Sequence, residues 1–198
     1  MRWRVTILSL ILLVCIAESA PAASTSYHIS SADPDAEDAI GWFDTGCAAT
    51  FAQPDRVRAR MARSGARRLD AHELAQTWLP NAGTEVWRFV ERPNGAHFTL
   101  TYDAATYTCV LLVSRVGGTA LRQAVKDMLD AWATCCNIAS RAFTESDKQV
   151  GGLTARYTDW IVQIPGHPYR YAIGLSTIES GTTAWRAIMS FNPTKTPF

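Results

Sequence analysis

The amino-acid sequence has no marked excess of charge of either sign. Its 198 residues include 19 lysines and arginines and 18 aspartates and glutamates, so the formal net charge is +1 at pH 7. A protein that attracts nucleic acid or anionic lipid through its overall charge needs a clear positive excess. The composition therefore argues against nucleic acid as a partner.

The motifs of the common catalytic and cofactor sites are missing as well. The chain has no glycine-rich loop of the Walker or Rossmann spacing, no C-x-x-C pair and no H-E-x-x-H string. The segment nearest to a nucleophile elbow, Gly174–Ile178, lacks the second glycine of that motif. These absences predict no cofactor and no metal site, and they favour a protein that is not an enzyme.

Histidine is scarce, with four residues in the chain. An acid–base site of an unfamiliar kind would use His97, on the polar face of an expected strand, or Asp159, beside Trp160 in an apolar strand. Contact with solvent explains both residues more simply. An envelope hydrolase is therefore the least favoured of the functions that we consider.

Long apolar runs are also scarce, and the one in this chain lies at its start. Arg2 and Arg4 precede the nearly unbroken apolar stretch Val5–Ala17, and the small residues Ala20–Ala22 follow it. A positive start, an apolar centre and an A-x-A end are typical of a secretory signal peptide. An uncleaved membrane anchor needs about 20 apolar residues, and this run is shorter. We predict a signal peptide over residues 1–22 and a periplasmic or secreted protein.

The remainder of the chain is long enough for one domain with a hydrophobic core. Residues 23–34 are mostly small and polar, so we expect a flexible leader there. The pattern then favours a single folded domain over residues 35–192 and a proline-bearing tail at 193–198. No integral membrane segment is expected after cleavage.

Five cysteines are present, and one of them, Cys15, lies in the signal peptide. Cleavage of the signal peptide leaves four cysteines, which are Cys47, Cys109, Cys135 and Cys136. An even number of cysteines in an oxidising compartment favours disulfides. We prefer a bridge between Cys47 and Cys109, because it would tie an early helix to a central strand. Pairing the adjacent Cys135 and Cys136 would close a strained ring. The alternative in which one of these two takes Cys47 or Cys109 as its partner stays open.

The spacing of apolar residues changes along the chain from helical to extended. Spacings of three and four predict helices over Asp35–Phe51, from Pro54 to before Gly65, and from Asp70 to Leu79. Alternating residues, together with one more continuously apolar run at 107–116, then predict six strands. These strands cover residues 85–92, 96–103, 107–116, 153–164, 169–177 and 183–191.

A long amphipathic helix separates the two groups of three strands. Thr119 can cap this helix. Its apolar stripe consists of Leu121, Val125, Met128, Leu129 and Trp132. We predict a single α+β domain with N-terminal helices and an antiparallel sheet of about six strands, which two αβββ halves could form together.

The densest local charge is a group of arginines within residues 56–68. We assign partner binding to Arg56, Arg60, Arg63 and Arg67, because they could contact an anionic partner such as an acidic protein surface. The simpler alternative is an exposed face whose charges are balanced by other residues.

Several short motifs together carry a resemblance to a family. They are Gly46-Cys47, Val86-Trp87, Tyr107–Val110, the helix Leu121–Trp132 and the strand Gly174–Thr177. With the predicted export signal, the chain resembles a loose group of short, uncharacterised exported proteins of proteobacteria. These proteins have an early helix cysteine and a central-strand cysteine, and the likeness covers about residues 40–192. The resemblance implies a periplasmic location and a Cys47–Cys109 bridge, but no activity or cofactor.

The leading functional hypothesis is a non-catalytic periplasmic protein that binds another protein. An inhibitor or immunity protein against a secreted or envelope-acting toxin is its sharpest form. The alternative is a module that holds a small molecule or a lipid between the sheet and the long helix.

Overall fold

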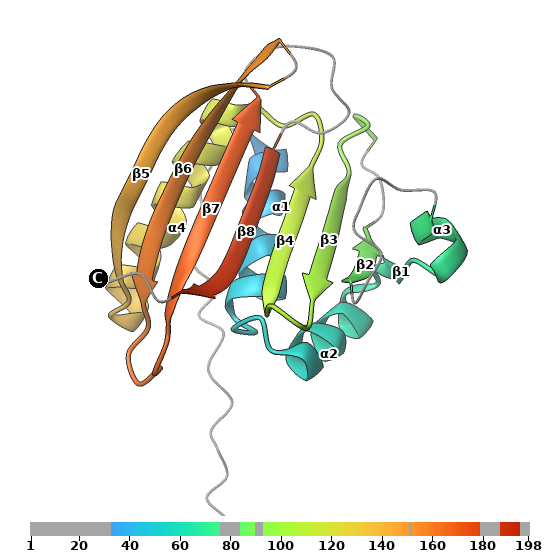
Figure 1. Cartoon of the computed structure of the whole chain (residues 1–198), viewed down its shortest axis with the longest axis horizontal. Coiled ribbons are helices and arrows are strands. Elements are labelled where there is room, and N and C mark those ends of the chain that lie inside the picture. Colours follow the sequence, from blue (N-terminus) through green and yellow to red (C-terminus); the bar gives the residue numbers. More distant parts are fainter. Residues whose placement is uncertain (1–32, 76–83, 90–92, 151, 179–186, 195–198) are drawn as a thin grey trace, which may run out of the picture.

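A computed structural model describes residues 33–75, 84–89, 93–150, 152–178 and 187–194 (Figure 1). The predicted signal peptide lies outside these residues, as do positions 23–32 of the predicted leader. The C-terminal part of the third predicted helix, at 76–79, also lies outside them.

The described strands form one antiparallel sheet in the order β1-β2-β3-β4-β8-β7-β6-β5. Their bounds are β1 Arg67–Arg68, β2 Thr84–Arg88, β3 Phe98–Asp103, β4 Thr108–Val113, β5 Ala139–Val150, β6 Leu153–Gln163, β7 Arg170–Ile178 and β8 Ala187–Thr194. The α+β class is confirmed, and a strand overlaps each of the six predicted ranges, of which residues 90–92 and 183–186 lie outside the described residues. The expected number is wrong by two, since the prediction lacked the short β1 and the polar β5.

Two meanders of four strands make up the sheet, one from each half of the chain. β1 to β4 pair in sequence order, as do β5 to β8. The meanders join where β4 pairs with β8, with Cys109 opposite Phe191 and Val113 opposite Ala187. The sheet thus has the two predicted groups, with four strands in each group in place of three.

Within the described residues, four α-helices and one turn of π-helix accompany the sheet. They are α1 Pro34–Phe43, the π-helical turn η1 Asp44–Ala48, α2 Pro54–Ser64, α3 Ala71–Ala75 and α4 Gly118–Cys136. The single early helix predicted over Asp35–Phe51 is therefore α1 continued by η1. The long amphipathic helix is confirmed as α4, which ends at a left-handed Asn137.

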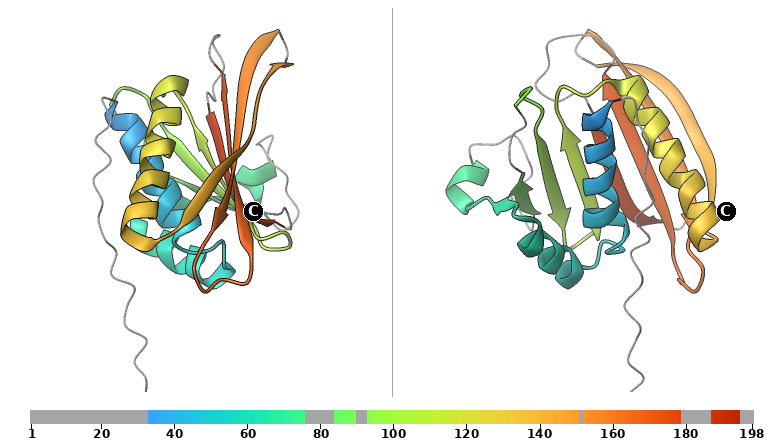
Figure 2. Two further views of the ribbon diagram at one scale, coloured as in Figure 1. Left: turned by 90° about the vertical axis from the view of Figure 1, so that its left-hand side faces the viewer. Right: turned by 180° about the vertical axis from the view of Figure 1, so that it is seen from behind.

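Helices α1 and α4 pack side by side on one face of the sheet (Figure 2). The apolar stripe of α4 faces the sheet, and Leu121, Val125 and Met128 are fully buried there. Leu100 of β3 and Ile173 of β7 belong to the same buried core cluster. Apolar burial of this extent is the main source of stability for the arrangement.

The preferred disulfide is confirmed at bonding distance, between Cys47 in η1 and Cys109 in β4. Both cysteines are fully buried. Gly46 allows η1 to approach the sheet this closely, because a Cβ atom at this position would lie 2.6 Å from Leu100 Cδ1. The bridge therefore fixes the N-terminal helical segment to the central strands.

The other two cysteines pair with each other, as a disulfide joins Cys135 to Cys136. Ring strain had argued against this pairing. The structure also excludes the alternative in which Cys135 or Cys136 takes Cys47 or Cys109 as its partner. Both exposed residues stand in the last turn of α4.

The expected domain limits of 35 and 192 each need a small correction. The carboxylate of Asp33 caps α1 by accepting a hydrogen bond from the amide of Asp35, so the fold begins before residue 35. Pro193 and Thr194 of the predicted tail belong to β8 and pair with Tyr171 and Arg170. Among the helices of the described ranges, none has both the length and the apolar character to cross a membrane.

Candidate functional site

Three connections gather at one end of the sheet, which we call the hairpin end. They are residues 49–53 between η1 and α2, residues 104–107 between β3 and β4, and residues 164–169 between β6 and β7 (Figure 1). Antiparallel pairing of β4 with β8, and of β8 with β7, brings the two hairpin turns to the same end. Contacts of residues 51 and 52 place the third connection beside them.

Phe51 is the central side chain of the hairpin end. Its ring packs against the imidazole of His167, with 4.0 Å between the ring centroids. The guanidinium of Arg56, in the first turn of α2, lies 5.8 Å from the Phe51 centroid. Phe51 and Ala52 both have positive φ angles, 52° and 49°, which are costly for residues other than glycine. Packing must compensate for this backbone strain.

His167 connects Phe51 to the hydrophobic core. Its Nδ1 atom lies 3.1 Å from the hydroxyl of Tyr171 in β7. The ring of Tyr171 stacks on Phe191 of β8, with 4.7 Å between centroids. Burial raises the pKa of the Tyr171 hydroxyl above its usual value. The rings therefore form a continuous series from the surface into the core.

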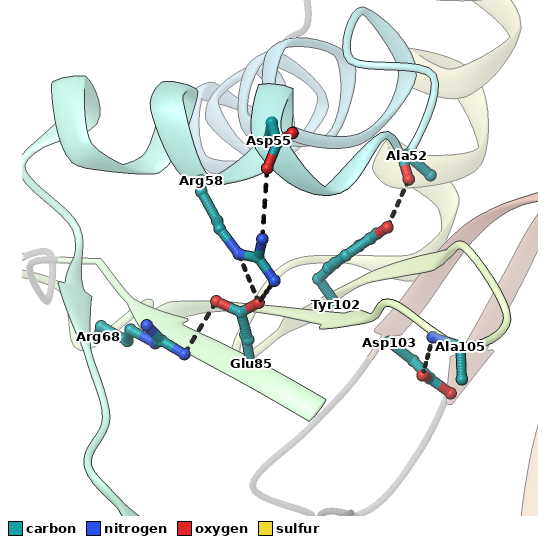
Figure 3. Close-up of polar contacts among 8 residues, drawn as sticks. All are labelled: Ala52, Asp55, Arg58, Arg68, Glu85, Tyr102, Asp103 and Ala105. Atoms are coloured by element: carbon teal, nitrogen blue, oxygen red, sulfur yellow. Dashed lines mark hydrogen bonds and ion pairs between the residues drawn. The ribbon is translucent and has the colours of Figure 1, made fainter. Parts of the chain in front are cut away.

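A buried tyrosine fixes the connection between η1 and α2 to β3 (Figure 3). The hydroxyl of Tyr102 donates a 2.7 Å hydrogen bond to the carbonyl oxygen of Ala52. Burial raises the pKa of Tyr102 to about 12, so the hydroxyl keeps its proton at neutral pH. This bond holds the strained residue next to Phe51 in place.

An ion-pair cluster fixes α2 to the strand β2, as Figure 3 also shows. The carboxylate of Glu85 accepts a 2.7 Å hydrogen bond from Nε of Arg58, and Nη2 of Arg68 lies 2.9 Å from its other oxygen. The Glu85 side chain is only 8% exposed, whereas those of Arg58 and Arg68 are 47% and 60% exposed. A hydrogen bond with Glu85 raises the pKa of Arg58. We interpret the cluster as structural, because it orients α2.

The turn between β3 and β4 is held by a carboxylate at its first residue. Asp103 accepts hydrogen bonds of 2.9 Å from the amide of Ala105 and from the hydroxyl of Thr106. These bonds lower the pKa of Asp103, which stays ionised at neutral pH. Tyr107 follows at a positive φ of 54°. The turn is therefore preorganised around an outward-facing tyrosine.

Two exposed tyrosines flank the hairpin end. Tyr107 is 48% exposed, and Tyr169, in the turn between β6 and β7, is 61% exposed. Three strand spacings separate the two turns in the sheet order, which corresponds to about 14 Å. A single interface patch of about 800 Å2 can cover both residues.

Three of the four arginines that the sequence assigned to partner binding share one face of α2. Arg56, Arg60 and Arg63 follow each other at spacings of four and three, which places them together on the helix surface. Among the described residues, Arg60 and Arg63 form no ion pair with an acidic side chain. Arg67 lies apart, in β1, where its Nη1 atom is 2.7 Å from Glu73. The ion pair with Glu73 therefore balances the charge of Arg67. In the described ranges, no such balance accounts for the arginine face of α2.

The residues considered for an acid–base site do not share a cleft. His97 precedes β3 and Asp159 lies in β6, four strand spacings or about 19 Å away. Asp159 faces Gly174 of β7, and burial raises the pKa of its carboxyl group. In the part of the chain that the structure describes, no three His, Cys, Asp or Glu side chains are grouped as a metal site would need.

A hollow of about 470 Å3 lies at the β1 edge of the first meander, opposite the edge that joins β8, where β1, β2 and α3 meet. Its lining consists of Arg68, Leu69, Asp70, Ala71, Leu74, Thr84 and Glu85. The lining arginine Arg68 is already paired with Glu85. These two polar side chains of the hollow therefore belong to the structural ion-pair cluster.

No family model matches the chain, and no curated protein has significant similarity to it. The resemblance to exported proteobacterial proteins therefore stays a prediction. The hairpin end stands as the candidate site on its geometry alone.

Proposed function

We propose that this is a non-catalytic protein that binds another protein through the hairpin end and the adjacent arginine face of α2. The observation that carries the proposal is the convergence of Tyr107, Tyr169 and Arg56 on one preorganised end of the sheet. Tyrosine and arginine are the residues most enriched among those that dominate binding energy at protein interfaces.

The ordered turns of the hairpin end support binding at this end of the sheet rather than at another surface. The turn of Tyr107 is held by Asp103, and the connection of Phe51 is held by Tyr102 and His167. A surface that is already ordered loses less conformational entropy on association. The two positive φ angles at residues 51 and 52 fit the same reading, because strained backbone is concentrated at functional sites.

The charge of the α2 face specifies the kind of partner. Arg56, Arg60 and Arg63 present three positive charges on one helix face, and Arg56 lies beside the ring of Phe51. An acidic protein surface complements this arrangement, and the attraction weakens as salt screens it. The partner that we propose therefore carries a cluster of aspartates and glutamates.

The predicted signal peptide and the buried Cys47–Cys109 bridge support an exported protein. In that compartment, an inhibitor or immunity protein against a secreted or envelope-acting toxin is the sharpest form of the proposal. Binding of a small molecule or lipid between the sheet and α4 is less favoured, because Leu121, Val125 and Met128 of α4 are fully buried in the core.

The test is affinity purification from a periplasmic extract with three versions of the mature chain. These are the wild type, the variant Arg56→Ala/Tyr107→Ala/Tyr169→Ala, and a control on the outer face of α4, Lys126→Ala/Asp130→Ala. We expect one protein to be retained by the wild type and the control and lost from the triple variant. Loss of a single dominant side chain costs about 2 kcal/mol, or about 30-fold in Kd.

Two results would contradict the proposal. The recovery of chaperones alone, with equal yields from all three chains, would remove the protein partner. A partner that binds the triple variant as tightly as the wild type, with no dependence on salt, would place the interface elsewhere.

A further inference from the structure

The two disulfides differ in nearly every respect. Cys47 and Cys109 are fully buried and join two elements of the fold across 62 positions of sequence. Cys135 and Cys136 are adjacent, exposed and both within α4, so their bond joins no two elements. The second disulfide therefore needs a different explanation from the first.

A stabilising role does not explain the Cys135–Cys136 bond. A disulfide stabilises a protein mainly by restricting the unfolded chain, and the effect grows with the length of the loop that it closes. Adjacent cysteines close no loop of intervening residues. The unfolded chain is thus hardly restricted by this bond, and its loss is expected to leave the thermal midpoint unchanged.

Accessibility makes the same bond open to chemistry. Thiol–disulfide exchange requires a thiolate to reach a sulfur atom, so exposed disulfides react and buried ones resist. Cys135 and Cys136 are both exposed, so a small-molecule thiolate can reach either sulfur atom of their bond.

We propose that Cys135–Cys136 is a thiol–disulfide exchange site, which small-molecule thiols open and close while the Cys47–Cys109 bridge stays intact. A thiolate attacks one of the two sulfurs, the bond between Cys135 and Cys136 breaks, and the released cysteine takes a proton from solvent. A second thiolate attacks the small-molecule sulfur of the resulting mixed disulfide, the two small molecules leave joined as a disulfide, and the second cysteine also takes a proton from solvent. The net reaction oxidises two thiols, transfers two electrons to the pair and leaves two cysteine thiols. It is independent of the proposed partner binding.

The test uses the folded mature protein in graded concentrations of reduced glutathione, without denaturant. Free thiols are trapped with iodoacetamide and located by peptide mapping. We expect Cys135 and Cys136 to be alkylated at least tenfold faster than Cys47 and Cys109, and to close again when oxidised glutathione is added. In the variant Cys135→Ser, Cys136 should retain a glutathione adduct that the wild type resolves.

A second measurement separates exchange from a structural role. The variant Cys135→Ser/Cys136→Ser should keep the thermal midpoint of the wild type. Alkylation of all four cysteines at one common rate would overturn the proposal, as would a fall of several degrees in the thermal midpoint of that variant. Purified native protein with Cys135 and Cys136 already reduced, and unchanged by oxidised glutathione, would also overturn it.

Discussion

The ring of Phe51 packs against the imidazole of His167, with 4.0 Å between the ring centroids, although the two residues belong to opposite halves of the chain. This contact joins the connection before α2 to the turn between β6 and β7. It thereby links the N-terminal helical segment to the second meander at the hairpin end.

Replacement of Phe51 by alanine should loosen this end of the molecule. We expect the free energy of unfolding to fall by about 1–2 kcal/mol, because a half-buried aromatic ring and its contacts with His167 and Arg56 are lost. Urea denaturation measures the change. Tyr169→Ala is the control, since this exposed side chain should change stability by less than about 0.5 kcal/mol. Equal effects of the two substitutions would contradict the packing role of Phe51.

Removal of the Cys47–Cys109 bridge should be the most costly single change. The loop that it closes spans 62 positions, for which restriction of the unfolded chain contributes about 4 kcal/mol. We expect Cys109→Ala and the double variant Cys47→Ala/Cys109→Ala to lose a similar amount, because either one removes the bridge. Guanidinium denaturation tests both. A single variant that keeps most of the wild-type stability would show that the bridge contributes little.

The ion pair of Glu85 with Arg58 should show strong coupling in a double-mutant cycle. Glu85 is nearly buried, so loss of one partner leaves the other poorly satisfied, and we expect a coupling free energy of about 1–2 kcal/mol. The pair of Arg58 with Asp55 is the matched control. The Asp55 side chain is 99% exposed, so that pair should couple by less than about 0.5 kcal/mol. The reverse order of coupling would refute this assignment.

The buried hydroxyl of Tyr102 predicts a loss of stability at alkaline pH. Its pKa is about 12 in the folded protein, whereas a tyrosine of the unfolded chain loses its proton near pH 10. Between these values the unfolded state binds fewer protons, so the free energy of unfolding falls as the pH rises. Burial raises the pKa of Tyr171 as well, which adds to the same decline.

Tyr102→Phe should therefore flatten the decline above pH 10. It should also cost about 1–2 kcal/mol at pH 7, because the carbonyl oxygen of Ala52 loses its donor. Tyr169→Phe is the control, since this exposed side chain should leave the wild-type slope in place. Urea midpoints between pH 8 and pH 11 measure both effects, and identical slopes for Tyr102→Phe and the wild type would speak against burial of this hydroxyl.

The strands of the inner sheet could be predicted because each has one apolar face. Phe98, Leu100 and Tyr102 alternate with threonines, and all three lie in the core as the alternation indicates. β5 has no such pattern, because among the described strands it pairs with β6 alone and it presents charged residues such as Glu145 and Lys148. Its strand conformation follows from pairing with β6, which is a long-range property.

The candidate site was less accessible to prediction than the fold. The arginines of α2 were noticed from their density, yet the contact of Arg56 with Phe51 and that of Phe51 with His167 depend on three-dimensional proximity. A histidine between two prolines gives no local signal that it packs on a distant ring. The sequence argument against a Cys135–Cys136 bond rests on ring strain, which depends on the conformation of the helix end.

The position of β8 in the sheet determines when the sheet can close during folding. This strand is synthesised after all the others that the structure describes, yet it lies between β4 and β7 in the sheet. Until residues 187–194 join the sheet, the edges of β4 and β7 that pair with β8 lack this partner, and the chain holds two incomplete halves. Closure of the sheet is therefore a late event, for which contacts distant in sequence must form together.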